Sequence, residues 1–74
     1  MNSEVNNPAF RDPSIEGFCR RHSLSRSSYY NLKNVGKAPR EYVVGKLIRI
    51  SPDAEADWVR DREAEAEARR ANAA

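Results

Sequence analysis

Residues 42–50 read YVVGKLIRI, and this run decides the fold that the sequence predicts. β-Branched and aromatic residues stand on both sides of Gly45, which favours two short strands. A glycine at the first central position of a two-residue turn suits a type II′ hairpin. The resulting register predicts three cross-strand pairs: Val44 with Leu47, Val43 with Ile48, and Tyr42 with Arg49.

The two faces of this hairpin differ in their expected surroundings, because successive side chains of a strand point to opposite faces. The face expected to pack on the core carries Val43, Ile48 and Ile50. The outward face carries Tyr42, Val44, Leu47 and Arg49, and Lys46 lies at the tip. A lone hairpin is only marginally stable, so we expect helices to support it.

Two short helices are predicted before the hairpin. Ser14 and Ser25 are good N-cap residues, Gly36 suits the position after a helix end, and Gly17 weakens the first helix by about 1 kcal/mol relative to Ala. The first helix has one face made of Ile15, Phe18, Cys19 and His22. The second has an inner half with Ser28, Tyr29, Leu32 and Val35, and an outer half with Arg26, Ser27, Tyr30, Asn31, Lys33 and Asn34. Two such helices joined by a short turn form a helix-turn-helix pattern.

A third helix is predicted after the hairpin. Residues 51–53 read SPD, which supplies an N-cap serine, a proline at the first helical position and an acid in the first turn. Trp58 shares a helical face with Ala54, with Val59 alongside, and we expect Trp58 to anchor this helix in the core.

The chain therefore divides into three parts. Residues 1–13 lack periodicity and are predicted as a flexible arm. Phe10 of this arm could dock on the domain that follows. Residues 14–62 form the predicted domain, which is mainly α with a small β-hairpin: a winged helix-turn-helix with three helices and a two-stranded wing. Residues 63–74 are a charged, alanine-rich helical tail that we expect to fray, with one ion pair at i,i+4 spacing between Glu65 and Arg69.

Charge is distributed unevenly along the 74 residues, whose net charge is +2. Residues 17–50 hold eight basic side chains and one acidic side chain, for a net charge of +7. Residues 51–74 hold four basic and seven acidic side chains, for −3, and residues 1–16 contribute the remaining −2. This asymmetry is typical of a basic surface that meets a polyanion, although a solvated charged surface would have the same composition.

Composition excludes several classes of function. One Cys and one His supply neither a disulfide framework nor the ligands of a zinc site. No apolar run approaches the length of a transmembrane helix, and the N-terminus lacks the pattern of a signal peptide. Cys19 is expected in the core, and His22 in a packing or capping role. The carboxylates at 53–67 lie on a solvated helix and form no catalytic pair in a cleft, so we do not expect an enzyme. Together, these observations predict a cytosolic protein that needs no metal or cofactor.

Four pieces of the sequence, in this order and at this spacing, carry a family resemblance. They are LSRSSYY at 24–30, GKAP at 36–39, GKLIRI at 45–50, and Trp58. The run from Ser14 to about Arg62 resembles the small excisionase and AlpA-type regulators of bacterial mobile elements, which are relatives of MerR-type winged helix-turn-helix proteins. Ala38 stands where a larger aromatic residue commonly precedes the proline. Tyr29 stands where an aliphatic residue is usual, which leaves open whether Tyr29 or Tyr30 is buried.

The resemblance implies a function. In that family the second helix of the helix-turn-helix enters the major groove of double-stranded DNA, and the wing contacts the backbone or minor groove. It also implies a role in excision at attachment sites or in promoter regulation, with an integrase as a partner and head-to-tail self-association along DNA. A nucleoid-associated location follows from such a role.

Two groups of residues are predicted to contact DNA. The recognition group is Arg26, Ser27, Tyr30, Asn31 and Asn34, and the phosphate group is Lys33, Lys37, Arg40, Lys46 and Arg49. Arginine pairs with guanine O6 and N7 and asparagine with adenine N6 and N7, whereas phosphate contacts supply affinity without sequence preference. The alternative is that these side chains are solvated and that Tyr30 packs in the core or on the wing.

Two other classes of function remain as alternatives. A protein-interaction module, of antitoxin or adaptor type, would use the acidic tail and the apolar patch formed by Val44 and Leu47. The same patch could instead serve self-association along DNA. It could also be no binding site at all, because isolated apolar side chains are common on protein surfaces. An RNA-binding protein is disfavoured, because side chains cannot read the deep, narrow major groove of A-form RNA.

Overall fold

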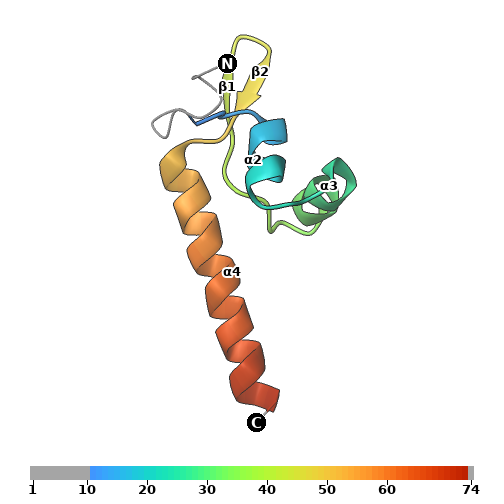
Figure 1. Ribbon diagram of the computed structural model, residues 1–74, viewed down its shortest axis with the longest axis vertical. Coiled ribbons are helices and arrows are strands. Elements are labelled where there is room, and N and C mark those ends of the chain that lie inside the picture. The colour runs from blue at the N-terminus through green and yellow to red at the C-terminus, as the bar shows by residue number, and fades with distance from the viewer. Residues whose placement is uncertain (1–10, 74) are drawn as a thin grey trace, which may run out of the picture.

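The computed structural model describes residues 11–73. Along the chain the elements are α2 (Ile15–Arg21), α3 (Arg26–Asn34), β1 (Tyr42–Val44), β2 (Leu47–Arg49) and α4 (Pro52–Ala73). The predicted class is confirmed, because the fold is mainly helical with a small antiparallel hairpin. In Figure 1 the hairpin projects at one end, α2 and α3 lie beside the upper part of α4, and the rest of α4 extends away from them.

Serine side chains cap the helices, as the sequence predicts. Ser14, Ser25 and Ser51 each accept a hydrogen bond through Oγ from the backbone N–H three residues later, at 3.0 Å from Gly17, 3.0 Å from Ser28 and 3.1 Å from Ala54. These bonds satisfy N–H groups that have no partner inside the helix, and each is worth about 1 kcal/mol.

Gly36 ends α3, also as predicted. Its φ is +76°, in the left-handed region, where glycine has no Cβ to clash. Its N–H donates to the carbonyl of Lys33 at 3.1 Å, and the N–H of Lys37 donates to the carbonyl of Leu32 at 2.8 Å. This pair of bonds is a Schellman motif, which satisfies the last carbonyls of α3 and turns the chain toward the hairpin.

The hairpin has the predicted register. Its strands pair Tyr42 with Arg49, Val43 with Ile48 and Val44 with Leu47. Gly45 has a φ of +61°, and Ser23 is the non-glycine residue of the described chain with a positive φ. Since Lys46 therefore has a negative φ, the turn is of type II′, in which only the first central residue needs the left-handed region.

The core forms where α2, α3, the base of the hairpin and the start of α4 meet. Its buried apolar residues are Ile15, Phe18, Cys19, Tyr29, Ile50 and Ala54. The Phe18 ring packs edge-on against Trp58, with centroids 4.9 Å apart, and against Tyr29 at 5.8 Å. Tyr29 is thus the buried tyrosine, whereas Tyr30 is 39% exposed. Cys19 lies in the core as predicted, and burial raises the pKa of its thiol.

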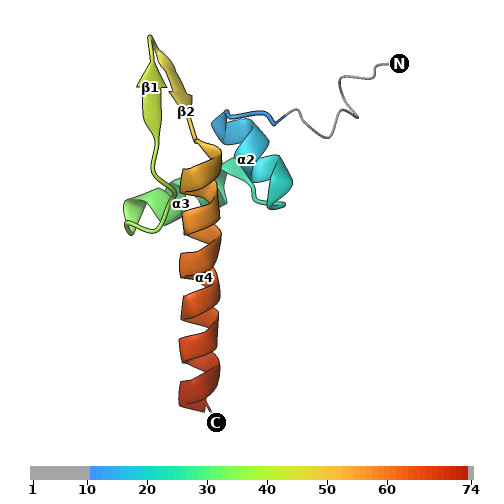
Figure 2. The same ribbon diagram turned by 90° about the vertical axis from the view of Figure 1, so that its left-hand side faces the viewer.

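Two residues predicted to face the core are exposed. Val43 is 65% exposed and Val35 is 66% exposed, so both predictions are wrong. The core meets the hairpin at Ile48 of β2, the cross-strand partner of Val43, and at no residue of β1. Figure 2 shows the hairpin projecting beyond the helices. Ile48 is half-buried against the core and Ile50 is fully buried. Val35 is the C-cap of α3, where the chain leaves the helix.

Residues 11–13, the end of the predicted arm, are hydrogen-bonded to the fold. The Pro13 carbonyl accepts from the Ile50 N–H at 2.8 Å, and Arg11 donates to the carbonyls of Ile50 at 2.8 Å and Ser51 at 3.2 Å. These bonds join positions about forty residues apart, so no local sequence pattern predicts them. Phe10 and the rest of residues 1–10 lie outside the described chain.

Gly17 is buried because Asp12 passes close to α2. A Cβ at position 17 would lie 2.5 Å from the Asp12 carbonyl oxygen, a distance at which the two atoms would clash. Asp12 Oδ1 also accepts from the Ser14 N–H at 3.0 Å and the Ser14 hydroxyl at 2.7 Å, which lowers the pKa of Asp12. The glycine that weakens α2 therefore permits residues 11–13 to pack against it.

The predicted tail continues α4 without a break, since that helix runs from Pro52 to Ala73. The predicted ion pair between Glu65 and Arg69 does not form. Glu65 accepts instead from Arg62 Nε at 3.0 Å and from Lys37 Nζ at 2.9 Å. The tail thus begins with a contact to the segment that joins α3 to the hairpin.

Candidate nucleic-acid interface

The five predicted recognition residues lie together on the exposed side of α3. Arg26, Ser27, Tyr30, Asn31 and Asn34 are all exposed, at positions that share one face of a helix. We call this surface the α3 outer face. Its side chains supply hydrogen-bond donors and acceptors, while the opposite side of the helix buries Tyr29.

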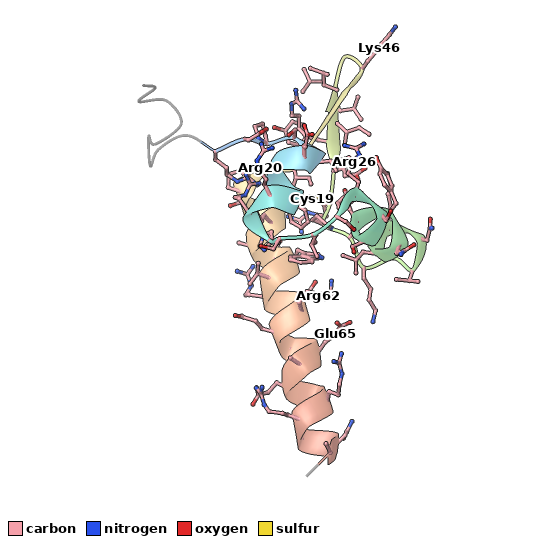
Figure 3. All side chains as sticks on the ribbon, turned by 45° about the vertical axis from the view of Figure 1, so that its right-hand side comes forward. Cys19, Arg20, Arg26, Lys46, Arg62 and Glu65 are labelled. Atoms are coloured by element: carbon pink, nitrogen blue, oxygen red, sulfur yellow. The ribbon has the colours of Figure 1, made fainter. Side chains whose placement is uncertain are left out.

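Arg26 and Tyr30 form a pair on the α3 outer face. The guanidinium carbon of Arg26 lies 5.7 Å from the centroid of the Tyr30 ring, within the range of a cation–π contact. Arg26 also donates to the Tyr30 hydroxyl at 3.4 Å. Figure 3 places Arg26 at the start of α3 and Lys46 at the tip of the hairpin, both away from the far end of α4.

Beneath the α3 outer face, Tyr29 is fixed to the segment that leads into the hairpin. Its hydroxyl donates to Glu41, and the other oxygen of Glu41 accepts from Lys33 Nζ at 3.1 Å. Burial, and then the hydrogen bond to Glu41, raise the pKa of Tyr29, so this phenol stays protonated over the physiological range. These contacts join α3 to the residue that precedes β1.

The five predicted phosphate contacts fall into two classes. Lys33, Lys37 and Arg40 are each paired with a carboxylate: Glu41 at 3.1 Å, Glu65 at 2.9 Å and Asp57 at 2.7 Å, respectively. Lys46 and Arg49 have no carboxylate partner among residues 11–73, and neither has Arg26. The basic centre of the chain is therefore partly neutralised within the molecule.

The hairpin combines Lys46 with exposed apolar side chains on both of its faces. The exposed fractions are 47% for Tyr42, 65% for Val43, 56% for Val44 and 54% for Leu47. Residues 42–49 contain no acidic side chain. The hairpin thus presents to solvent an apolar surface with a cation at its tip.

A polar cluster around Glu55 was not predicted. Its carboxylate accepts from Arg11 and Arg21, the latter at 2.7 Å, and contacts His22 Nε2 at 2.6 Å. Burial alone would raise the pKa of Glu55, but the hydrogen bonds from Arg21, Arg11 and His22 outweigh it and lower the pKa to about 2. In the sequence Glu55 is one of several acids on a charged helix, and nothing local distinguishes it.

His22 has the predicted packing and capping role. It is the C-cap of α2, and its ring lies 4.7 Å from Phe18 and 5.0 Å from Trp58 between centroids. Trp58 anchors α4 as predicted, and its Nε1 donates to the Lys37 carbonyl at 2.7 Å. These contacts join α2, α4 and the segment after α3.

Over residues 11–73, no helix is both long and apolar enough to cross a membrane. The same stretch of chain contains no group of three or more His, Cys, Asp or Glu side chains that could hold a metal ion. Comparison of the sequence with protein-family models, and of the chain with curated proteins and solved structures, finds no match.

Proposed function

We propose that this protein is a sequence-specific, double-stranded DNA-binding protein of the winged helix-turn-helix type. In this proposal α3 enters the major groove, and the hairpin is the wing, which contacts the DNA backbone or the minor groove. The protein acts as an excisionase, that is, a recombination directionality factor, or as a transcription regulator of a bacterial mobile element. It works in the cytoplasm, associated with the nucleoid.

One observation carries the proposal. The α3 outer face brings together Arg26, Tyr30 and Asn31 on an exposed helix, and a short turn connects α2 to this helix. A protruding α-helix fits the width of the major groove, and these side chains carry the donors and acceptors that read base edges there.

The hairpin supports the proposal that it contacts the DNA next to α3. Lys46 at its tip lacks a carboxylate partner within the described residues, so a phosphate can take that place. The apolar side chains around it suit a minor groove, because minor-groove binders insert apolar side chains between base steps. Contacts between hairpins of neighbouring copies, and a contact with an integrase, belong to the proposed recombination role.

The salt dependence of binding tests the proposal. In a fluorescence-anisotropy titration with duplexes from the protein's own genomic neighbourhood, log K should fall linearly with log salt by about 0.9 per phosphate contacted. Contacts by Lys46 and Arg49 alone give a slope of about −1.8, whereas all five predicted phosphate contacts give about −4.5. Salt-independent binding, or no binding to any duplex, would rule the proposal out.

Asn31→Ala tests base reading by the α3 outer face. Loss of an amide that pairs with adenine should cost about 1–3 kcal/mol at the preferred site and relax the preference at one base pair. Lys46→Ala is the matched control, because loss of a phosphate contact weakens binding to all sequences alike. Equal losses on all sequences for Asn31→Ala would show that Asn31 only positions the protein.

A protein-interaction module is the second candidate function, favoured by the exposed apolar side chains of the hairpin. Such a module would bind a protein partner through Val44 and Leu47, each more than half exposed. In that case Val44→Ser should abolish partner capture, while Arg26→Ala and Lys46→Ala should leave it unchanged.

A further inference from the structure

The Arg26–Tyr30 pair differs from the other polar side chains of the α3 outer face because both members have a defined neighbour. The guanidinium lies over the Tyr30 ring and donates to the Tyr30 hydroxyl. Ion pairs hold Lys33, Lys37 and Arg40 to carboxylates, but within residues 11–73 no carboxylate holds Arg26. The guanidinium of Arg26 is thus oriented by an aromatic ring, and the donors other than the one bonded to Tyr30 remain open to an external acceptor.

Tyr30 is itself supported from the core. Its ring packs edge-on against the ring of Tyr29, with centroids 5.4 Å apart and an interplanar angle of 89°. Tyr29 is fully buried and donates its hydroxyl to Glu41. A continuous set of contacts therefore runs from Glu41 through the two tyrosines to Arg26.

A guanidinium held in this way suits a particular acceptor. Its parallel N–H groups match the O6 and N7 atoms of guanine in the major groove. Prior restriction of the long Arg26 side chain reduces the conformational entropy that binding would otherwise cost. A phosphate would also accept two parallel bonds from Arg26. Arg26 is the first residue of α3, however, and the N-terminal residues of a recognition helix are the ones that reach base edges.

We propose that Tyr30 is a positioning residue that holds Arg26 for a two-bond contact with O6 and N7 of a guanine. The DNA site read by α3 therefore contains a guanine at the position opposite the first turn of the helix. This inference rests on the proposed DNA-binding function and deepens it.

The test compares natural guanine with 7-deazaguanine, which lacks the N7 acceptor. The 74-residue chain first selects its preferred duplex from a random duplex library. Each guanine of that duplex is then replaced in turn, and the ratio of the two dissociation constants is measured for every position. The ratio cancels any change in the folded fraction of a variant, so a purely structural role of Tyr30 would not alter it.

The wild-type protein should show one position with a ratio of about ten, the loss expected for one charge-assisted hydrogen bond. Arg26→Ala should bring that ratio to about one. Tyr30→Ala should also lower it, whereas Tyr30→Phe, which keeps the ring beneath the guanidinium, should retain most of it. Val35→Ala is the matched control, because it truncates an exposed side chain at the end of α3 that has no assigned DNA contact, and it should leave the ratio unchanged.

Three outcomes would overturn the inference. If Arg26→Ala weakens binding to all duplexes equally and keeps the ratio, Arg26 contacts phosphate and the proposed function still stands. If Tyr30→Ala keeps the wild-type ratio, Tyr30 does not position Arg26. If no duplex is selected and no salt-dependent binding occurs, the proposed function fails together with the inference.

Discussion

Cations on the two sides of this small fold have different surroundings. On the side formed by α3 and the hairpin, Arg26, Lys46 and Arg49 lack carboxylate partners within the described residues. On the side that faces α4, carboxylates of that helix hold Arg21, Lys37 and Arg40. The acidic helix thus neutralises basic side chains selectively, according to where they lie.

This difference teaches that net charge is a poor measure of an anion-binding surface. Residues 17–50 have a net charge of +7, yet several of their cations already have anionic partners from α4. The more exposed of these pairs, Lys37 with Glu65 and Arg40 with Asp57, add little stability, because solvent and salt screen them. Their effect is to reduce the number of cations that meet an external polyanion.

Phe18→Ala should have the largest effect, because the Phe18 ring joins both sides of the fold. Its side chain is fully buried and contacts Tyr29 on α3 and Trp58 on α4. Truncation should cost about 3–5 kcal/mol, which rivals the whole stability of a domain of this size. Urea unfolding followed by circular dichroism should show one early transition, and Phe18→Leu should lose less. Separate transitions for the two sides would contradict a common core.

Gly17→Ala should destabilise the fold, although helix propensity alone predicts a gain of about 1 kcal/mol. The new Cβ would clash with the Asp12 carbonyl oxygen at 2.5 Å, and overpacking of this kind costs about 1–3 kcal/mol. The urea midpoint should fall, whereas Glu16→Ala, at the exposed neighbouring position, should change it little. A raised midpoint for Gly17→Ala would show that residues 11–13 do not pack against α2.

Acid should weaken the α4 side through Glu55. Its pKa in the folded protein is about 2, below the ordinary value of 4.5, so its contribution is present above pH 4.5. That contribution is lost as the pH falls from 4.5 toward 2, and it amounts to about 1–2 kcal/mol after allowance for solvent screening. Urea unfolding between pH 6 and pH 2.5 should show this loss, and Glu55→Gln should flatten the profile. An unchanged profile in Glu55→Gln would assign the acid sensitivity to other carboxyls.

Glu65→Gln should have the smallest effect on the fold and a distinct effect on DNA binding. It frees Lys37 from its partner at 2.9 Å, so one more phosphate contact should steepen the salt slope by about 0.9. Removal of residues 63–74, which include Glu65, should likewise leave DNA binding intact or slightly stronger. Glu67→Gln is the matched control. This substitution removes the same charge, but Glu67 pairs with Arg70 of its own helix and not with Lys37. Equal slopes for both variants would mean that pairing with α4 does not restrain Lys37.

Much of the fold could be predicted because its signals are local. The caps at Ser14, Ser25 and Ser51 bond to residues three positions away, and the turn at Gly45 sets the hairpin register. The exposed position of Arg26 and its neighbours on the α3 outer face follows from the helical period. Period and turn chemistry depend on nearest neighbours in the chain, so they are legible without a three-dimensional structure.

Tertiary structure alone decided which side chains pair and which predicted core positions remain in solvent. Arg11 meets Glu55 across 44 positions, and Lys37 meets Glu65 across 28, through the placement of α4. Val43 alternates correctly along its strand but stays exposed, because the core meets the hairpin at Ile48 of β2 and at no residue of β1. Sequence by itself determined the elements and their faces. Long-range packing determined which of those faces meet and which cations remain available to an external anion.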